Sequence, residues 1–438
     1  MRLFTALILL VLASLPARAE VDIQEVISPG GIKAWLVQEP SIPFATLEIR
    51  FRGGASLDPA DKRGVMNLMT GLIEEGAGDM DARSFVRAQE ELATSLGFDI
   101  SRDELSVSAR FLTENREASL ALLKTAIDSP RFDPDAIERV RAQVLSGIRF
   151  DQTNPNDIAG RALREIIYGD HPYGHPVEGT VDSITGLTRD DIVAAHRAIM
   201  AKDRLYVGAA GDISAEELGP ILDTLLGDLP ETGAPMPPKA EIDIPPGTTI
   251  VDFETPQSVA LFGQRGVAQS DPDFFTALLL NQVLGAGGFE SRLMTEVREK
   301  RGLTYGVYSY LASSDLAAVY LGSVSSANDR IAEAIDVIRD EWRKAAEDGV
   351  TAEELEAAKT YVTGAYPLRF DGNGPIANIL VGMQLLGLPI DYIATRNDRV
   401  TSVTLEDVKE LAGELLEPDG LHFVVVGQPV GLEVSLTE

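Results

Sequence analysis

Few stretches of this chain carry side chains suited to chemistry, and the segment "HPYGHPVEG" from His171 to Gly179 is the first candidate. His171, His175 and Glu178 are three residues of kinds that bind zinc, and they lie within eight positions of one another. Each histidine precedes a proline, however, and a residue before proline avoids the helical geometry that would place two ligands on one face. We therefore interpret the segment as a structural loop.

The other candidates are isolated. His196 is expected on an amphipathic helix and His422 in a strand, and neither has a carboxylate or a histidine near it in sequence. The glycine-rich "LGAGGFESRL", residues 284–293, follows a helical pattern and lacks the Lys-Ser/Thr pair of a phosphate loop. Its glycines are expected to let another backbone approach closely, for example a bound peptide added to a sheet edge. No G-x-S-x-G motif supports a serine hydrolase.

The segment "RGVMNLMTGLIEEGAG", residues 63–78, predicts a helix that lacks chemical groups. Its apolar residues have the three-to-four spacing of a buried face. The positions between them include Asn67, Thr70 and Gly71, none of which is a good zinc ligand or a base. The apolar face consists of Val65, Met66, Leu68, Met69, Leu72 and Ile73.

The chain has 438 residues, contains no cysteine and is acidic, with a net charge of −30. Residues 1–19 have a basic start, an apolar run too short to span a bilayer comfortably, and the small-x-small sequence Ala17-Arg18-Ala19, as in a secretory signal peptide. An uncleaved anchor is the alternative. The negative charge disfavours nucleic acid and anionic lipid as partners. The sequence thus predicts an exported protein without stable membrane insertion, periplasmic if its source is a Gram-negative bacterium.

Two blocks of sequence recur at nearly equal offsets. The segments that begin at Leu187 and Val403 match at an offset of 216. Within the segments that begin at Leu47 and Leu261, Gly53 matches Gly266 and Asp58-Pro59 matches Asp271-Pro272 at an offset of 213. Each copy of the first pair predicts a helix with a threonine N-cap, Thr188 or Thr404, followed by a strand that ends in glycine. Between the copies lies a stretch with six prolines, which predicts a stiff linker.

This repetition predicts an α+β fold of two homologous α/β sandwich domains, each a mainly antiparallel sheet flanked by helices. The expected helices include Asp135–Arg149 and Thr351–Thr363, which carry acids near their starts. The predicted boundaries are a signal peptide at 1–19, an N-terminal domain at 20–228, the linker at 229–247 and a C-terminal domain at 248–438.

The segment 63–78, with the preceding Gly-Gly strand end and Asp-Pro turn, resembles the first domain of the pitrilysin/insulinase family of zinc metallopeptidases. In active members this helix carries H-x-x-E-H, whose histidines bind zinc while the glutamate activates water. The resemblance places these positions at Asn67, Thr70 and Gly71, and the third ligand, a glutamate, at Gly147. This chain is therefore expected to bind no metal and to lack a cofactor of its own.

The second half keeps another part of the family pattern. "FESRLMTEVREKRGLTYGVYSY" resembles the segment in which an arginine and a tyrosine seven residues later bind substrate, here Arg298 and Tyr305. A guanidinium and a phenol can hold a peptide carbonyl and stabilise its oxyanion. Alternatively, Arg298 pairs with Glu296 or Glu299 on a surface helix, and Tyr305 begins a strand.

In two-chain members of the family one subunit carries the zinc motif and the other the Arg/Tyr pair, and this chain resembles the second kind. The resemblance implies a non-catalytic subunit of a heterodimeric zinc metallopeptidase, with peptide as substrate and zinc in its homologous partner. Two alternatives stay open. One is a peptide- or protein-binding scaffold without a role in proteolysis, and the other is an enzyme with an unrecognised site.

Overall fold

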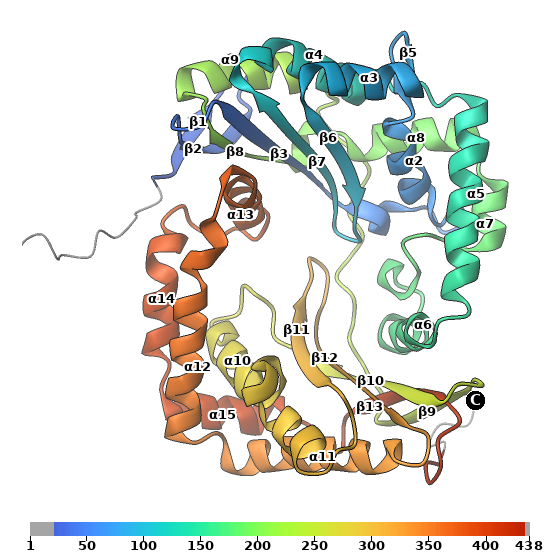
Figure 1. The fold of residues 1–438 in the computed structure, drawn as a ribbon, viewed down its shortest axis with the longest axis vertical. Coiled ribbons are helices and arrows are strands. Elements are labelled where there is room, and N and C mark those ends of the chain that lie inside the picture. The colour runs from blue at the N-terminus through green and yellow to red at the C-terminus, as the bar shows by residue number, and fades with distance from the viewer. Residues whose placement is uncertain (1–21, 434–438) are drawn as a thin grey trace, which may run out of the picture.

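The computed structural model describes residues 22–433, so the predicted signal peptide at 1–19 lies outside the described residues. Two halves, each built on one large sheet, are stacked with most of their helices on the outside (Figure 1). The first sheet has the order β1-β2-β8-β3-β7-β6 and is antiparallel except for the β2–β8 pair. Its strands are β1 (Gln24–Ile27), β2 (Lys33–Gln38), β3 (Phe44–Arg52), β6 (Ser95–Ile100), β7 (Glu104–Leu112) and β8 (Leu205–Gly211).

The second sheet repeats this order as β9-β13-β10-β12-β11, again with one parallel pair, β9–β13. β10 occupies the residues of β3 shifted by 213, the offset of the sequence repeat. The predicted fold of two homologous, mainly antiparallel α/β domains is therefore confirmed. The strands are β9 (Gly247–Asp252), β10 (Gln257–Arg265), β11 (Val307–Ser313), β12 (Ala318–Ala327) and β13 (His422–Gly427).

Two helices, one in each half, begin at the threonine caps that the sequence predicts. Thr188 accepts a hydrogen bond from the Asp191 N–H and forms a capping box, and Thr404 does the same with Asp407 in the second half. α5 and α6 each begin with a proline in their first turn. The helices are α2 (Val65–Ile73), α3 (Ala82–Leu92), α4 (Arg116–Asp128), α5 (Pro134–Asp151), α6 (Pro155–Tyr168), α7 (Val181–Gly186), α8 (Arg189–Ile199) and α9 (Ala215–Leu226).

The second half contains α10 (Phe274–Asn281), α11 (Ile331–Asp348), α12 (Ala352–Ala365), α13 (Asn373–Leu385), α14 (Tyr392–Ser402) and α15 (Leu405–Leu415). α15 covers the residues of α8 shifted by 216. The predicted apolar face of α2 is buried in the first core, which confirms the helical spacing. α2 is shorter than segment 63–78, because Gly76 and Gly78 adopt positive φ and lead into the small β4–β5 hairpin (Gly76–Ala77, Met80–Asp81).

Each half lends one helix to the sheet of the other. α6, from the first half, packs on β10 and β13, while α13, from the second half, packs on β8, β3 and β2. A Cβ added at Gly208 of β8 would lie 2.4 Å from the Ala377 carbonyl oxygen of α13, so glycine permits this close approach. Gln384 of α13 also donates a hydrogen bond to the Val207 carbonyl, 2.7 Å long. The two halves are therefore interlocked.

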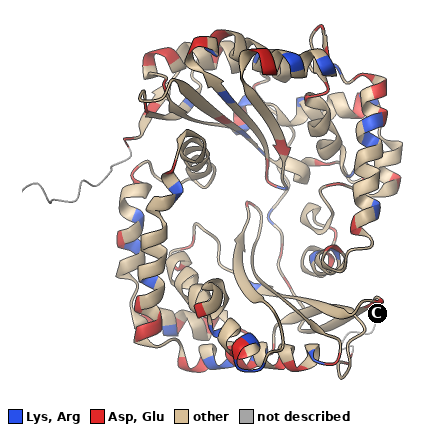
Figure 2. Ribbon diagram, viewed as in Figure 1, with Lys and Arg blue, Asp and Glu red and all other residues tan. Residues whose placement is uncertain are grey.

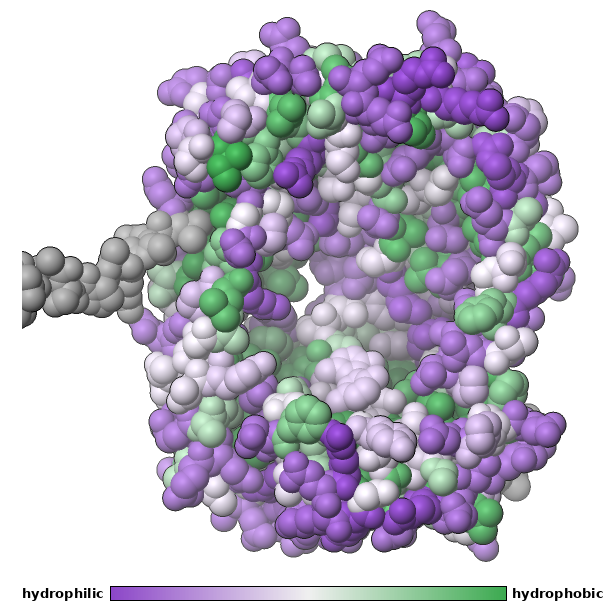
Figure 3. All heavy atoms as spheres, in the orientation of Figure 1, coloured by the Kyte–Doolittle hydropathy of each residue, from purple (hydrophilic) through white to green (hydrophobic). Residues whose placement is uncertain are grey.

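The space-filling view is hollowed between the two halves (Figure 3). Charged side chains of both signs are interspersed over the outer helices (Figure 2). Within residues 22–433, no helix combines the length and the apolar character needed to cross a membrane.

Candidate functional site

The four positions that the family uses for zinc lie on the packed helices α2 and α5. Asn67 is half-buried, and the Thr70 hydroxyl donates to the Met66 carbonyl, 2.8 Å away, as an internal helix bond. Gly71 and Gly147 are exposed. A Cβ at Gly71 would lie 3.3 Å from Val140 Cγ1 of α5, whereas one at Gly147 would meet nothing within 4 Å.

Nothing in the described part of the chain replaces the missing ligands. Among residues 22–433 no group of three or more His, Cys, Asp or Glu side chains could hold a metal ion. Active zinc sites of this type need two imidazoles and a carboxylate to hold the metal. An amide, a hydroxyl and two glycines supply neither zinc ligands nor a general base.

In the loop from His171 to Gly179, the first histidine has a structural role, because both of its ring nitrogens contact backbone groups. His171 Nδ1 accepts a hydrogen bond from the Tyr173 N–H (3.2 Å), and Nε2 lies 2.9 Å from the Pro238 carbonyl of the linker. The neutral tautomer with a proton on Nε2 satisfies both contacts. His175 and Glu178 instead line a pocket beside α6.

The two remaining histidines also bond to backbone. His196 Nε2 lies 2.9 Å from the Ile127 carbonyl, and burial lowers the pKa of His196. His422 is fully buried between the Pro245 carbonyl (2.7 Å from Nδ1) and the Thr249 hydroxyl (3.0 Å from Nε2). Neither imidazole is part of a candidate site.

The free edge of the first sheet, beside α2, is capped by the chain's own side chains. In the register of β6 with β7, Leu96 faces Ala109 and Phe98 faces Val107. The Leu96 N–H donates to Gln89 Oε1 (3.0 Å) and the Phe98 N–H to Glu74 Oε1 (3.2 Å). These acceptors occupy the places that the carbonyls of an added strand would take.

Arg298 lies in η7 (Met294–Glu299), a π-helical turn of the kind often found at functional sites. Its guanidinium carbon is 4.6 Å from the ring centroid of Phe289, which is 63% exposed. Glu296 forms ion pairs with Lys300 and Arg301 instead of with Arg298. Within residues 22–433 Arg298 forms no ion pair, so a cation–π contact holds a guanidinium that keeps its donors available.

Tyr305 is 87% exposed and lies two residues before β11. Among the described residues, no hydrogen bond joins Tyr305 to Arg298. The two residues lie on neighbouring segments, η7 and the loop that follows it, with the Tyr305 side chain exposed and Arg298 half-buried.

In the glycine-rich segment, residues 284–293, the absence of a side chain allows another part of the same chain to approach closely. A Cβ at Gly285, in the π-helical turn η5 (Gln282–Ala286), would lie 2.6 Å from the Ser309 nitrogen of β11. The close approach expected from these glycines thus occurs at Gly285, but the backbone that approaches belongs to β11 and not to a bound peptide. η5 packs beside β11 as α2 packs beside β6 in the first half.

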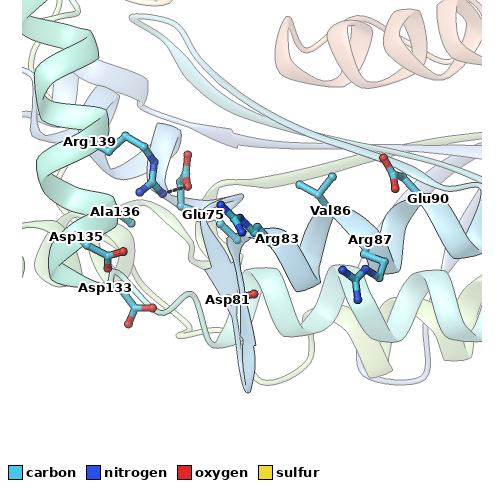
Figure 4. A pocket seen from close by; sticks show the side chains of 11 residues that line it. Glu75, Asp81, Arg83, Val86, Arg87, Glu90, Asp133, Asp135, Ala136 and Arg139 are labelled. Carbon is cyan, nitrogen blue, oxygen red and sulfur yellow. Dashed lines mark hydrogen bonds and ion pairs between the residues drawn. The ribbon is translucent and has the colours of Figure 1, made fainter.

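A large outer groove of about 800 Å³ lies between α3 and the start of α5. Its walls are charged, and the Arg139–Glu75 ion pair crosses one end (Figure 4). Arg83, Arg87, Asp81 and Glu90 are spread along α3 and its start, so the groove is a solvated face of mixed charge.

Sequence reasoning missed Phe289, Glu74 and Gln89 as parts of these sites. Phe289 precedes Arg298 by nine residues, and helical spacing predicts no contact at that separation. Glu74 and Gln89 touch β6 through the tertiary fold, for which the sequence has no local signal.

Comparison with known families matches two adjacent parts of the chain. Residues 33–181 match the family described as insulinase (peptidase family M16), and residues 186–362 match the peptidase M16 inactive domain. The boundary between the matches falls just before α8.

Similar proteins have different names. A Helicobacter pylori protein named non-peptidase homolog YmxG is 26% identical over 386 residues, which cover 88% of this chain and 89% of that protein. A Bacillus subtilis protein named uncharacterized zinc protease YmxG is 24% identical, covering 89% and 94%.

Solved structures share the fold. A peptidase M16 inactive domain from Pseudomonas fluorescens is 28% identical with a TM-score of 0.87, covering 94% of this chain and 99% of that one. A Helicobacter pylori protease is 16% identical with a TM-score of 0.83, covering 92% and 99%. The positions on α2 and α5 where the family has its zinc site lack zinc-binding side chains. Together with this observation, the matches show that the chain is an inactive member of the insulinase family, peptidase family M16.

Proposed function

We propose that the chain is the non-catalytic subunit of an exported heterodimeric zinc metallopeptidase, periplasmic if its source is a Gram-negative bacterium. It forms half of a peptide-binding chamber and presents Arg298 and Tyr305 to a peptide held at the zinc of a homologous H-x-x-E-H subunit. One observation carries the proposal. The Arg298 guanidinium is positioned by Phe289 but free of ion pairs within the described residues, while the three ligand positions and the base position of the family's zinc site hold none of the required side chains.

Chemically, the guanidinium donates two parallel hydrogen bonds and the phenol one. Donors aimed at a carbonyl oxygen stabilise the negative charge that develops there when zinc-bound water attacks. The exposure of Tyr305 leaves its hydroxyl accessible to such a carbonyl.

A scaffold that binds peptides or proteins without a role in proteolysis is the second candidate. The name of the Helicobacter pylori relative, non-peptidase homolog, favours it. The two candidates differ in whether Arg298 affects turnover by a partner.

The test is co-expression with an H-x-x-E-H subunit, followed by peptide cleavage and zinc analysis of the complex. Arg298→Ala and Tyr305→Phe should each lower kcat by about 10²–10³-fold while the zinc content and the heterodimer stay intact. The two losses should be less than additive because both residues act on one oxygen.

Arg298→Lys should rescue little activity, because an ammonium cannot reproduce the planar fork of donors. Arg343→Ala, on the outer helix α11, is the matched control and should leave turnover unchanged. Full activity of an intact Arg298→Ala heterodimer would favour the scaffold. Loss of activity only through dissociation would make Arg298 a structural residue.

A further inference from the structure

A second group of arginines lies in a pocket of about 560 Å³ between the end of α5, α6 and the loop at residues 174–180. α6 is the helix that the first half lends to the second sheet, so this pocket adjoins the junction of the halves (Figure 1). Arg102, from the β6–β7 turn, and Arg161 and Arg164, from α6, line it.

These guanidiniums are incompletely satisfied. The Nε atoms of Arg102 and Arg164 are buried without a hydrogen-bond partner. Within residues 22–433 none of the three arginines forms an ion pair, although carboxylates also line the pocket. A buried, unpaired donor on a charged group is costly, so each such group requires an explanation.

The two guanidiniums are also close enough to affect each other. Burial, and next the like charge of Arg102, lowers the pKa of Arg164 to about 10. Arg164 lies back along its helix, with Nη1 3.2 Å from where a Cβ of Gly160 would stand. The glycine at this position therefore leaves room for the arginine to take its place in the pocket wall.

Two tyrosines of the other half lie on β11, outside the lining of this pocket. Burial, and next the charge of Tyr308, raises the pKa of Tyr310. The positive charge of Arg164 offsets part of this rise. Tyr308 and Tyr310 are stacked on β11, with ring centroids 6.2 Å apart, and are 53% and 44% exposed. Two guanidiniums that line one pocket suit a carboxylate, because each can donate two parallel hydrogen bonds to it.

We propose that Arg102 and Arg164 form a carboxylate-binding site for a bound peptide. The carboxylate is either the C-terminus of the peptide or an acidic side chain, and it accepts hydrogen bonds from the Nη groups of the two guanidiniums, which bond to no described residue. The proposal rests on the proposed peptide-binding function and adds a substrate preference that the acidic net charge of the chain would not suggest.

The experiment measures binding of fluorescent peptides to the purified full chain by fluorescence anisotropy. One peptide with uncharged side chains is prepared as a free acid and as a C-terminal amide, and a third has an amide end and one internal glutamate. The free acid should bind at least about 10-fold more tightly than the uncharged amide, as expected for charge-assisted hydrogen bonds. Tight binding of the glutamate peptide would identify a side chain as a second source of the carboxylate.

Arg164→Ala and Arg102→Ala should each reduce the preference to about 2-fold or less, and Arg164→Lys should restore part of it. Arg83→Ala, which removes the same charge from the outer groove, should keep the full preference. The midpoint of unfolding of each variant is measured and compared with that of the wild type, to show that the variant folds. Equal binding of all three peptides by the wild type would overturn this site alone, whereas failure of all peptides to bind would overturn it together with the peptide chamber.

Discussion

Glu74 Oε1 accepts a hydrogen bond of 3.2 Å from the backbone N–H of Phe98, on the free edge of β6. With the Gln89–Leu96 bond beside it, this contact caps an edge that would otherwise expose unpaired donors. Burial raises the pKa of Glu74, so this carboxylate is held in place at some cost in solvation.

The first prediction concerns this edge. Glu74→Ala should accelerate amide exchange at Phe98 by about 2- to 10-fold, and Gln89→Ala should do the same at Leu96, because a net hydrogen bond is worth about 0.5–1.5 kcal/mol. Glu74→Gln keeps an acceptor and should exchange like the wild type. Glu75→Ala, at the adjacent residue, is the control. Unchanged exchange at Phe98 in Glu74→Ala would show that water caps this amide equally well.

A second prediction concerns the helix that the second half lends to the first sheet. Gly208→Ala places a methyl group 2.4 Å from the Ala377 carbonyl oxygen, so α13 must shift. We expect a loss of about 1–3 kcal/mol in the free energy of unfolding, as for other overpacked sites. Urea denaturation measures it. Gly186→Ala, whose Cβ would meet nothing within 4 Å, should change stability by less than about 0.5 kcal/mol.

A third prediction concerns Asp58, which accepts hydrogen bonds from the N–H groups of Gly64 (2.6 Å) and Met66 (3.0 Å) before α2. Burial raises its pKa from 3.8 to about 7. The folded state then holds a proton that the unfolded state releases, so this stabilising contribution is present at low pH and is lost as pH rises to about 7.

Between pH 3.8 and about 7, the free energy of unfolding should fall with a slope that approaches about 1.4 kcal/mol per pH unit. Urea denaturation from pH 4 to pH 8 measures it, and Asp58→Asn should lack it. Identical pH profiles for the two proteins would mean that the backbone donors hold Asp58 ionised throughout.

The fourth prediction concerns metal. The wild-type chain should contain no stoichiometric zinc and cleave no peptide alone, because Asn67, Thr70, Gly71 and Gly147 supply no ligands. The triple variant Asn67→His, Gly71→His and Gly147→Glu should bind one zinc per chain, provided that α2 and α5 keep the separation of an active site. The side chain at position 147 has open space, and Val140 must yield slightly for the one at position 71.

Metal analysis after dialysis measures the content, and the double variant without the change at Gly71 is the control. A folded triple variant without zinc would show that the helices have moved apart. One tightly bound zinc in the wild type, lost on changing His171 or His175, would make the loop at residues 171–179 a metal site.

The sequence alone was sufficient for features with local or periodic causes. The threonine caps at Thr188 and Thr404 predicted both helix starts, because a cap acts on backbone groups within three residues. The offsets of 213 and 216 predicted two homologous sheets, because equal patterns of apolar and turn residues form equal strands. The absence of zinc ligands at Asn67, Gly71 and Gly147 also follows from residue type.

Tertiary structure alone decided which parts meet across the chain. The packing of α13 on the first sheet depends on the close approach at Gly208, and a glycine in a strand gives no sequence signal of which segment will pack against it. The contact of Arg298 with Phe289, the capping of Phe98 by Glu74 and the placement of Arg102 and Arg164 in one pocket join residues whose spacing matches no local period. Such contacts arise because chain segments far apart in sequence are brought together by burial of the shared cores, and burial does not depend on sequence separation.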